Sequence, residues 1–174
     1  MTNFNQSTRD MVANIKDGLF VESSESEYDV WGKKVQAYYF QVTNRVIIHA
    51  LFAEVTETIA GAVQTVFNYI QTTPSISLAA LSTVHASIAS YVPGSRITYI
   101  GGSVAAAAIT LSTGAISYLP STIPTILGVT PLAGVDSVGK IGFLSSVTDA
   151  SDGTLKFGVL YTPLDPGASI EALI

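Results

Sequence analysis

Arg45-Val46-Ile47-Ile48-His49-Ala50-Leu51-Phe52-Ala53-Glu54-Val55 is the stretch that decides the fold class of this 174-residue chain. The run is almost continuously apolar, which is typical of a strand that is buried on both faces. A helix is the rival interpretation. Three β-branched residues in a row, Val46 to Ile48, favour the strand because they lose side-chain freedom in a helix and pack well on a pleated surface.

Further strands are predicted on either side of this run. Val35 to Val42 is rich in aromatic and β-branched residues, and Thr43-Asn44 is a plausible turn between it and the central run. Ala62 to Ile70 is a third candidate strand, which Thr72-Thr73-Pro74 would end. Its proposed core-facing residues alternate, and they are Val63, Thr65, Phe67 and Tyr69.

The C-terminal third predicts a hairpin. Val138 to Leu144 is strand-like, and Thr154 to Tyr161 alternates between apolar and small or polar residues. Asp149 to Gly153 lies between them and is typical of a turn. The apolar face of the second strand would be Leu155, Phe157, Val159 and Tyr161.

The middle of the chain is ambiguous. We predict a short helix over Leu78 to Ser90, a short strand over Arg96 to Ile100, and either a strand or an Ala-rich helical turn over Val104 to Leu111. Pro120, Pro124 and Pro131 indicate loop or edge structure. Short strands with frequent Gly and Pro predict an all-β domain over residues 31–174, a β-sandwich or a jelly-roll-like barrel.

Residues 1–30 are predicted to be an N-terminal arm, extended or short-helical. Met11, Val12, Ile15 and Leu19 recur at helical spacing, and Gly18 is a candidate end of the helix. An isolated helix this short is marginal in water, so the arm either frays or orders against a neighbouring subunit. The acidic, Ser-rich stretch Glu22 to Glu27 is expected to be an exposed loop.

Charge is distributed very unevenly along the chain. The 78 residues from Thr58 to Val135 contain a single charged side chain, Arg96, and only 12% of the whole chain is charged, against about a quarter in an ordinary soluble domain. A surface with so little charge associates readily with copies of itself. The composition therefore predicts assembly into a homo-oligomer.

Composition also excludes several classes of protein. A net charge of −5 without a basic patch argues against nucleic acid as a partner. The absence of cysteine excludes disulfides and thiolate metal sites. We find no run of about 20 apolar residues that would span a membrane. The first residues, Met1 to Gln6, do not have the pattern of a signal peptide.

Signals for catalysis are weak, and we predict neither an enzyme nor a bound metal or cofactor. His49 and His85 are the only histidines, and they form no metal-binding motif. No Gly-x-Ser-x-Gly elbow is present. The charges of Glu54 and Glu57 are either solvated or paired with Arg45, Lys33 or Lys34 of a neighbouring copy, so Arg45, Glu54 and Glu57 join the four arm residues as candidate interface residues.

Three stretches together resemble small virion proteins of tailed bacteriophages. They are Val42 to Thr56, Ala62 to Val66, and Gly158 to Ala168, the last containing Tyr161-Thr162-Pro163-Leu164-Asp165-Pro166-Gly167-Ala168. In those proteins a Val-Thr-Gly-x-Val-Leu-Ile-like strand comes early and a Tyr-x-Pro-Leu-x-Pro-Gly-Ala-like ending closes the chain. Here Asn44-Arg45 stands in place of the Gly-x pair.

The resemblance implies a decoration or cement protein on the surface of the virion. Such proteins typically form trimers at capsid symmetry axes and clamp subunits of the major capsid protein. On this interpretation, deleting residues 1–30 weakens attachment and leaves the oligomer folded. The alternative is a head-fibre or tail adhesin module that binds a host glycan through an exposed aromatic groove containing Trp31, Tyr38 and Tyr39.

Overall fold

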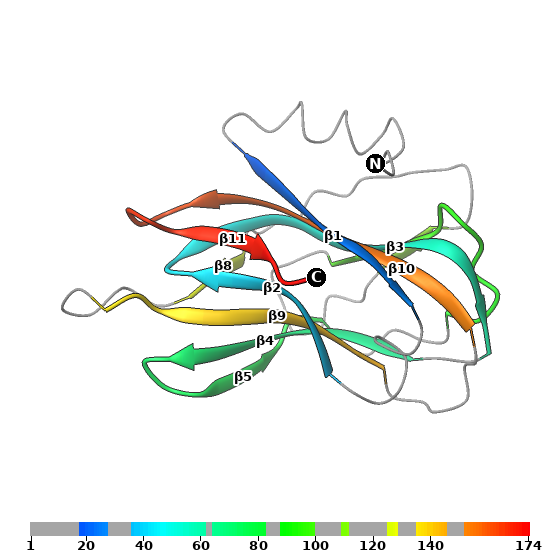
Figure 1. Cartoon of the computed structure of the whole chain (residues 1–174), viewed down its shortest axis with the longest axis horizontal. Helices are drawn as coiled ribbons and strands as arrows, with labels where there is room; N and C mark the ends of the chain where they lie inside the picture. The colour runs from blue at the N-terminus through cyan, green and yellow to red at the C-terminus, as the bar shows by residue number, and fades with distance from the viewer. Residues whose placement is uncertain are drawn as a thin grey trace.

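The computed structural model describes residues 18–27, 36–61, 64–82, 88–99, 109–111, 125–128, 135–145 and 152–174, and every regular element among them is a β-strand. Two antiparallel sheets pack against each other as a β-sandwich, which confirms the predicted all-β fold (Figure 1). The six-stranded sheet consists of β1 (Leu19–Glu27), β10 (Asp152–Pro163), β3 (Val46–Ala60), β6 (Arg96–Tyr99), β7 (Ile109–Leu111) and β8 (Thr125–Leu127). The five-stranded sheet consists of β11 (Ser169–Ala172), β2 (Gln36–Thr43), β9 (Val138–Ser145), β4 (Thr65–Thr73) and β5 (Ser77–Ala80).

Strand β3 is the long central strand that the sequence predicted, and it organises the six-stranded sheet. One edge of β3 pairs with β10 along almost its whole length, and the other edge pairs first with β8 and then with β6. His49 is an extra residue in β3, because Ile48 pairs with Tyr161 and Ala50 pairs with Leu160. This bulge changes which residues face the core, so Ile48 and Leu51 both point inward.

A second bulge lies in β2, where Tyr38 pairs with Gly142 and Phe40 pairs with Ile141. Tyr39 is the extra residue. Both Tyr39 and Phe40 are consequently buried in the core, although they are neighbours in the sequence and would face opposite ways in a regular strand.

Aromatic rings from both sheets fill the centre of the sandwich. The ring of Phe157 stacks on that of Tyr39, with a centroid separation of 3.6 Å, and meets the edge of Phe143 at 5.1 Å. Phe143 in turn contacts Phe67 at 5.0 Å. Tyr39, Phe67, Phe143 and Phe157 are all almost completely buried. This aromatic column ties β10 of one sheet to β2, β9 and β4 of the other.

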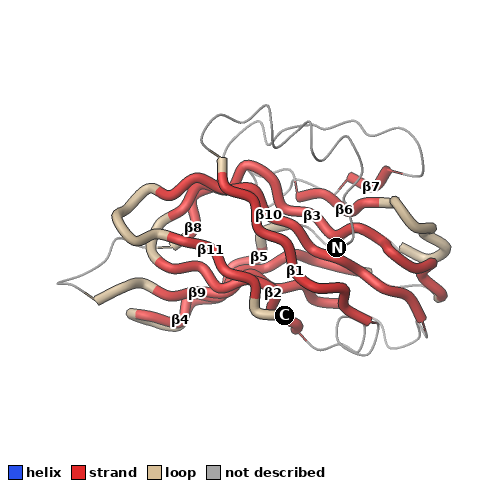
Figure 2. The backbone as a smooth tube through the Cα atoms, turned by 45° about the horizontal axis from the view of Figure 1, so that its top comes forward, coloured by secondary structure: helices blue, strands red, loops and turns tan. Residues whose placement is uncertain are grey.

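The chain end that follows β11 joins the two sheets along one side (Figure 2). The amide of Leu173 donates to the carbonyl of Tyr39 in β2, and the carbonyl of Ile174 accepts a bond from the amide of Ser24 in β1. Ser24 is free to make this bond because β1 bulges between Glu22 and Glu25. On this side the sandwich is closed by hydrogen bonds in the manner of a barrel.

The predicted C-terminal hairpin is wrong. Strands β9 and β10 are where the sequence placed them, but β9 pairs with β2 and β4, whereas β10 pairs with β1 and β3. The two strands therefore belong to different sheets. The alternating pattern identified a core-facing side in each strand, but it carries no information about which strand lies alongside. Of the predicted turn Asp149 to Gly153, residues 149–151 lie outside the described residues.

Two further expectations need correction. Glu22 to Glu27, expected to be an exposed loop, belongs to β1 and pairs with β10, so residues 19–27 of the predicted arm are part of the sheet. The short helix predicted over Leu78 to Ser90 is wrong at its start, because Ser77–Ala80 is strand β5, paired with β4. Residues 83–87 of that segment lie outside the described residues, as do residues 104–108 of the predicted strand or helical turn and all three prolines of the predicted loop. Residues 109–111, which end that strand or helical turn, are strand β7.

Candidate interaction surfaces

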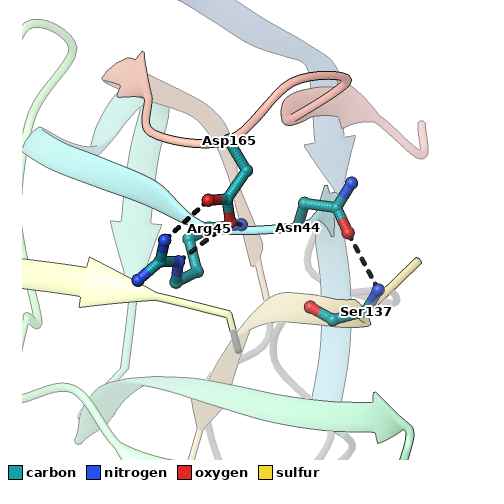
Figure 3. Close-up of polar contacts among 4 residues, drawn as sticks. All are labelled: Asn44, Arg45, Ser137 and Asp165. Atoms are coloured by element: carbon teal, nitrogen blue, oxygen red, sulfur yellow. Dashed lines mark hydrogen bonds and ion pairs between the residues drawn. The ribbon is translucent and has the colours of Figure 1, made fainter. Parts of the chain in front are cut away.

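The corner between β2 and β3 carries a polar network that joins it to residues 136–137 and to Asp165 (Figure 3). The chain crosses here from one sheet to the other, and Asn44 adopts a left-handed backbone conformation with φ of 57°. The amide of Asn44 donates to the carbonyl of Ser137 at 2.8 Å, and its side-chain Oδ1 accepts from the amide of Ser137 at 2.9 Å. Its Nδ2 donates to Oδ1 of Asp136 at 2.9 Å.

Arg45, the next residue, is bound by Asp165 of the segment between β10 and β11. Its Nε and Nη2 donate to the two carboxylate oxygens at 2.9 and 2.6 Å, and its backbone amide donates to Oδ2 at 3.2 Å. These hydrogen bonds raise the pKa of Arg45 and lower the pKa of Asp165 from their ordinary values. Arg45 thus has an ion-pair partner in its own chain, and its role at an interface stays a prediction.

Glu54 is also paired within the chain. Strand register aligns Glu25 of β1, Lys156 of β10, Glu54 of β3 and Arg96 of β6 in one row across the outer face of the six-stranded sheet. Nε of Arg96 donates to Oε2 of Glu54 at 2.8 Å, and Nζ of Lys156 lies 3.1 Å from Oε1 of Glu22. The side chains of Arg96 and Lys156 are only 3% and 7% exposed. The row alternates in sign, so Lys156 lies between two carboxylates, while Arg96 lies between Glu54 and Leu111 of β7.

Of the other predicted interface residues, some are exposed to solvent and the rest lie outside the described residues. Glu57 is exposed, and its Oε2 accepts a hydrogen bond from Oγ1 of Thr154 at 2.9 Å. Leu19, the first residue of β1, is exposed at the edge of the sheet. Met11, Val12 and Ile15 lie outside the described residues, as do Lys33 and Lys34.

The histidines give no catalytic constellation in the part of the chain that the structure describes. His49 lies at the β3 bulge, and its Nε2 is 2.8 Å from Oγ1 of Thr162, while partial burial lowers its pKa. His85 lies outside the described residues.

The aromatic groove of the glycan-binding alternative loses one of its members. Tyr39 is 1% exposed and stacks on Phe157 in the core, and its hydroxyl lies 3.2 Å from Oγ of Ser26. Burial raises its pKa to about 12. Tyr38 faces the opposite way, with Nζ of Lys140 5.6 Å from its ring centroid. Trp31 lies outside the described residues.

One surface was not predicted from the sequence. Strand β5 and the turn before it present two exposed apolar side chains, Ile76 and Leu78, which are 81% and 63% exposed. Leu78 pairs with Ile70 of β4, which is also partly exposed. The signal was available in the sequence, because Ser75-Ile76-Ser77-Leu78 alternates with period two after Pro74. The helix predicted from Leu78 onward is incompatible with this edge strand.

Comparisons with known proteins add no family: no protein-family model matches the chain, and neither does any curated protein or solved structure. Among the described residues, no group of three His, Asp or Glu side chains gathers where it would hold a metal ion. The same residues contain no helix with the length and apolar character needed to cross a membrane.

Proposed function

We propose that this protein is a structural component of a tailed-bacteriophage head, a decoration or cement protein that forms a homotrimer and binds the major capsid protein at the capsid surface. The proposal starts from the resemblance carried by residues 42–56, 62–66 and 158–168. In the fold, the first and last of these stretches are neighbours, because β3 pairs with β10 and Arg45 binds Asp165. They therefore specify one structural corner.

The observation that carries the proposal is the environment of Arg96. This residue holds the only charge between Thr58 and Val135, and the structure neutralises it in a nearly buried ion pair with Glu54. The neutral stretch therefore contributes no exposed charge, while it contributes the exposed side chains of Ile76 and Leu78. Surfaces of this composition are typical of interfaces between subunits that stay together.

Size-exclusion chromatography with light scattering tests the oligomeric state directly. We expect a single species with three times the 18.2 kDa chain mass at concentrations of about 10 μM, because permanent homomeric interfaces bury large apolar areas. A monodisperse monomer under these conditions would contradict the proposed trimer.

Binding to phage heads that lack the protein tests the partner. Residues 1–17 precede the first described strand, so their deletion tests the arm without touching the sheet. We expect this truncation to weaken attachment and to leave the unfolding transition unchanged. Deleting residues 1–30, as the sequence alone suggested, also removes β1 and uncovers an edge of β10, so we expect that longer truncation to be destabilised. Undiminished attachment of the shorter truncation would show that the arm is not the contact.

A further inference from the structure

Strand β5 is the last strand of the five-stranded sheet, at the bottom of Figure 1. Its inner edge pairs with β4 from Ser77 to Ala80. In the described residues no strand pairs with its outer edge. The opposite end of the same sheet is different, because β11 and the residues after it are tied to β1 by the bond from Ser24 to Ile174. Among the described residues, one side of the sandwich is thus closed by hydrogen bonds, whereas β5 has no strand at its outer edge.

The register shows which backbone groups of β5 point outward. The amide of Leu81 donates to the carbonyl of Phe67, and hydrogen-bonded pairs alternate with non-hydrogen-bonded pairs in an antiparallel ladder. Ala79 is therefore bonded to Tyr69, whereas Leu78 and Ala80 direct their amide and carbonyl groups away from β4. A row of outward-pointing groups at this spacing is matched by another extended strand.

Strand β5 is short, but it carries neither the charges nor the prolines that often prevent strand pairing at an edge. Natural proteins place Lys, other charges or Pro on exposed edges. Residues 65–80, which comprise β4, β5 and their connection, contain no charged residue at all, and Pro74 lies in the turn before β5. The side chains of Ile76 and Leu78 are exposed beside the free edge.

We propose that β5 pairs with β5 of a second copy of this chain, antiparallel, about a two-fold axis at Leu78. With the axis at Leu78, the Leu78 residues of the two copies face each other. Ile76 of each copy lies across from Ala80 of the partner, so the contact is self-complementary. Because the edge is uncharged, it matches an uncharged partner strand, and the chain itself supplies one. The contact would join the two five-stranded sheets into one continuous sheet.

The small size of the contact determines the conditions under which two copies pair. Two four-residue strands bury far less than the ~1,200 Å² of a stable interface, so the pairing is weak between free molecules. It becomes significant when copies are held side by side, where effective concentrations reach the order of 1 mM. This step rests on the proposed function: a shell would hold trimers next to one another, and a two-fold contact would link neighbouring trimers laterally.

Because the chain has no cysteine, a single introduced thiol reports on this contact without interference. Residues in a hydrogen-bonded antiparallel pair have Cα atoms ~5.5 Å apart, within the range that a disulfide spans. We expect Leu78→Cys, oxidised at about 1 mM protein, a concentration chosen to match a tethered neighbour, to give disulfide-linked chain pairs. Ile126→Cys is the matched control, since Ile126 is 59% exposed on β8 of the other sheet. Equal yields from the two variants would overturn the proposal.

A second variant tests the same edge without oxidation. Leu78→Lys places a charge on each side of the two-fold axis, and its side chain is already exposed, so folding should be unaffected. We expect sedimentation at about 1 mM to show pairing of the parent protein and at least a tenfold weaker pairing of Leu78→Lys. No difference between the two would contradict the inference. Cross-linking without attachment to heads would refute only the capsid role, whereas attachment without cross-linking would refute only the β5 contact.

Discussion

The guanidinium of Arg45 is held by both carboxylate oxygens of Asp165, a residue 120 positions further along the chain. The pair joins the corner where β2 passes into β3 to the segment between β10 and β11. Asn44 fixes the other side of the same corner through Ser137. Residues 42–56 and 158–168 thus meet at a corner that sets how the two sheets are connected.

Asp165→Asn should lower the stability of the protein near neutral pH. The pKa of Asp165 in the folded state is below its ordinary value of 3.8, because the ionised carboxylate accepts hydrogen bonds from Arg45. Its stabilising effect is therefore fully present above pH 3.8 and is lost as the pH falls through the lowered pKa of the folded state. Calorimetry should show a lower Tm for Asp165→Asn at pH 7 and a narrowing difference below about pH 4.

Glu171→Gln is the control for this experiment, because Glu171 is an exposed carboxylate on β11. We expect its Tm to follow that of the parent protein over the same pH range. A constant difference between Asp165→Asn and the parent protein from pH 7 to pH 3 would show that the Asp165 charge is not the source of the effect.

Gly128→Ala should destabilise the corner more than a matched substitution elsewhere. Gly128 has φ of 87°, and a Cβ there would approach the backbone carbonyl oxygen of Asn44 far inside van der Waals contact. Gly94 has nearly the same φ, 88°, with no atom within 4 Å of the added carbon. We expect Gly94→Ala to cost ~1 kcal/mol for the left-handed backbone alone and Gly128→Ala to cost ~1–3 kcal/mol more for the steric clash. Chemical denaturation measures both, and equal losses would mean that β8 does not end against Asn44.

The sequence was sufficient to predict the strands whose apolar pattern is strong. The central strand β3, the strands β2, β4, β6 and β9, and the turn at Asn44 all lie within a few residues of their predicted places. Burial of one strand face is a local property, so it leaves a local pattern in the sequence. Leu155, Phe157, Val159 and Tyr161 all face the core as predicted.

The apolar pattern of the sequence does not predict which strands pair or where a strand contains a bulge. Nothing in the alternation of β9 and β10 shows that they lie in different sheets, because pairing is a long-range property. The bulges at Tyr39 and His49 reverse the inward face within a strand, and the period-two rule assumes that no residue is extra. The pairing of Arg45 with Asp165 and of Glu54 with Arg96 likewise depends on register, so a sequence with several charges of each sign gave no means of choosing between intrachain and intersubunit partners.

Phe157→Ala should cost about 3–5 kcal/mol of folding free energy, as for other large buried aromatics. The ring lies between Tyr39 and Phe143 and connects the two sheets, so its removal leaves a cavity lined by both. Phe157→Leu fills most of that volume and should cost less. Equilibrium denaturation measures the loss, and a change below about 1 kcal/mol would contradict the central position of this ring.

Arg96→Met should destabilise the protein by about 3–5 kcal/mol, because it leaves the Glu54 carboxylate without its cation in a largely buried site. The double substitution Arg96→Met with Glu54→Gln leaves no unpaired carboxylate at this site. Its loss of folding free energy should therefore be less than the sum of the losses in the two single variants. A double-mutant cycle from denaturation curves gives this coupling. Additive costs would mean that the two side chains do not interact in solution.

High pH should destabilise the protein through its buried tyrosines. The pKa values of Tyr39 and Tyr69 are raised from 10.0 to about 12, in both cases chiefly by burial. Each hydroxyl therefore keeps its proton in the folded state at a pH where the unfolded chain loses it, so the stability that it contributes is complete below pH 10 and falls between pH 10 and about 12. Tyr39→Phe removes one such group, and the fall in Tm above pH 10 should be shallower in this variant.

Tyrosinate absorbance gives an independent readout of the same groups. At pH 11 folded parent protein and folded Tyr39→Phe should have the same tyrosinate signal, because Tyr39 is still protonated there. After unfolding in denaturant at the same pH, the parent protein should gain one tyrosinate more than the variant, since the exposed hydroxyl then has its ordinary pKa. If the folded proteins already differ by a full tyrosinate at pH 11, Tyr39 is accessible to solvent and the aromatic column between the sheets is open in solution.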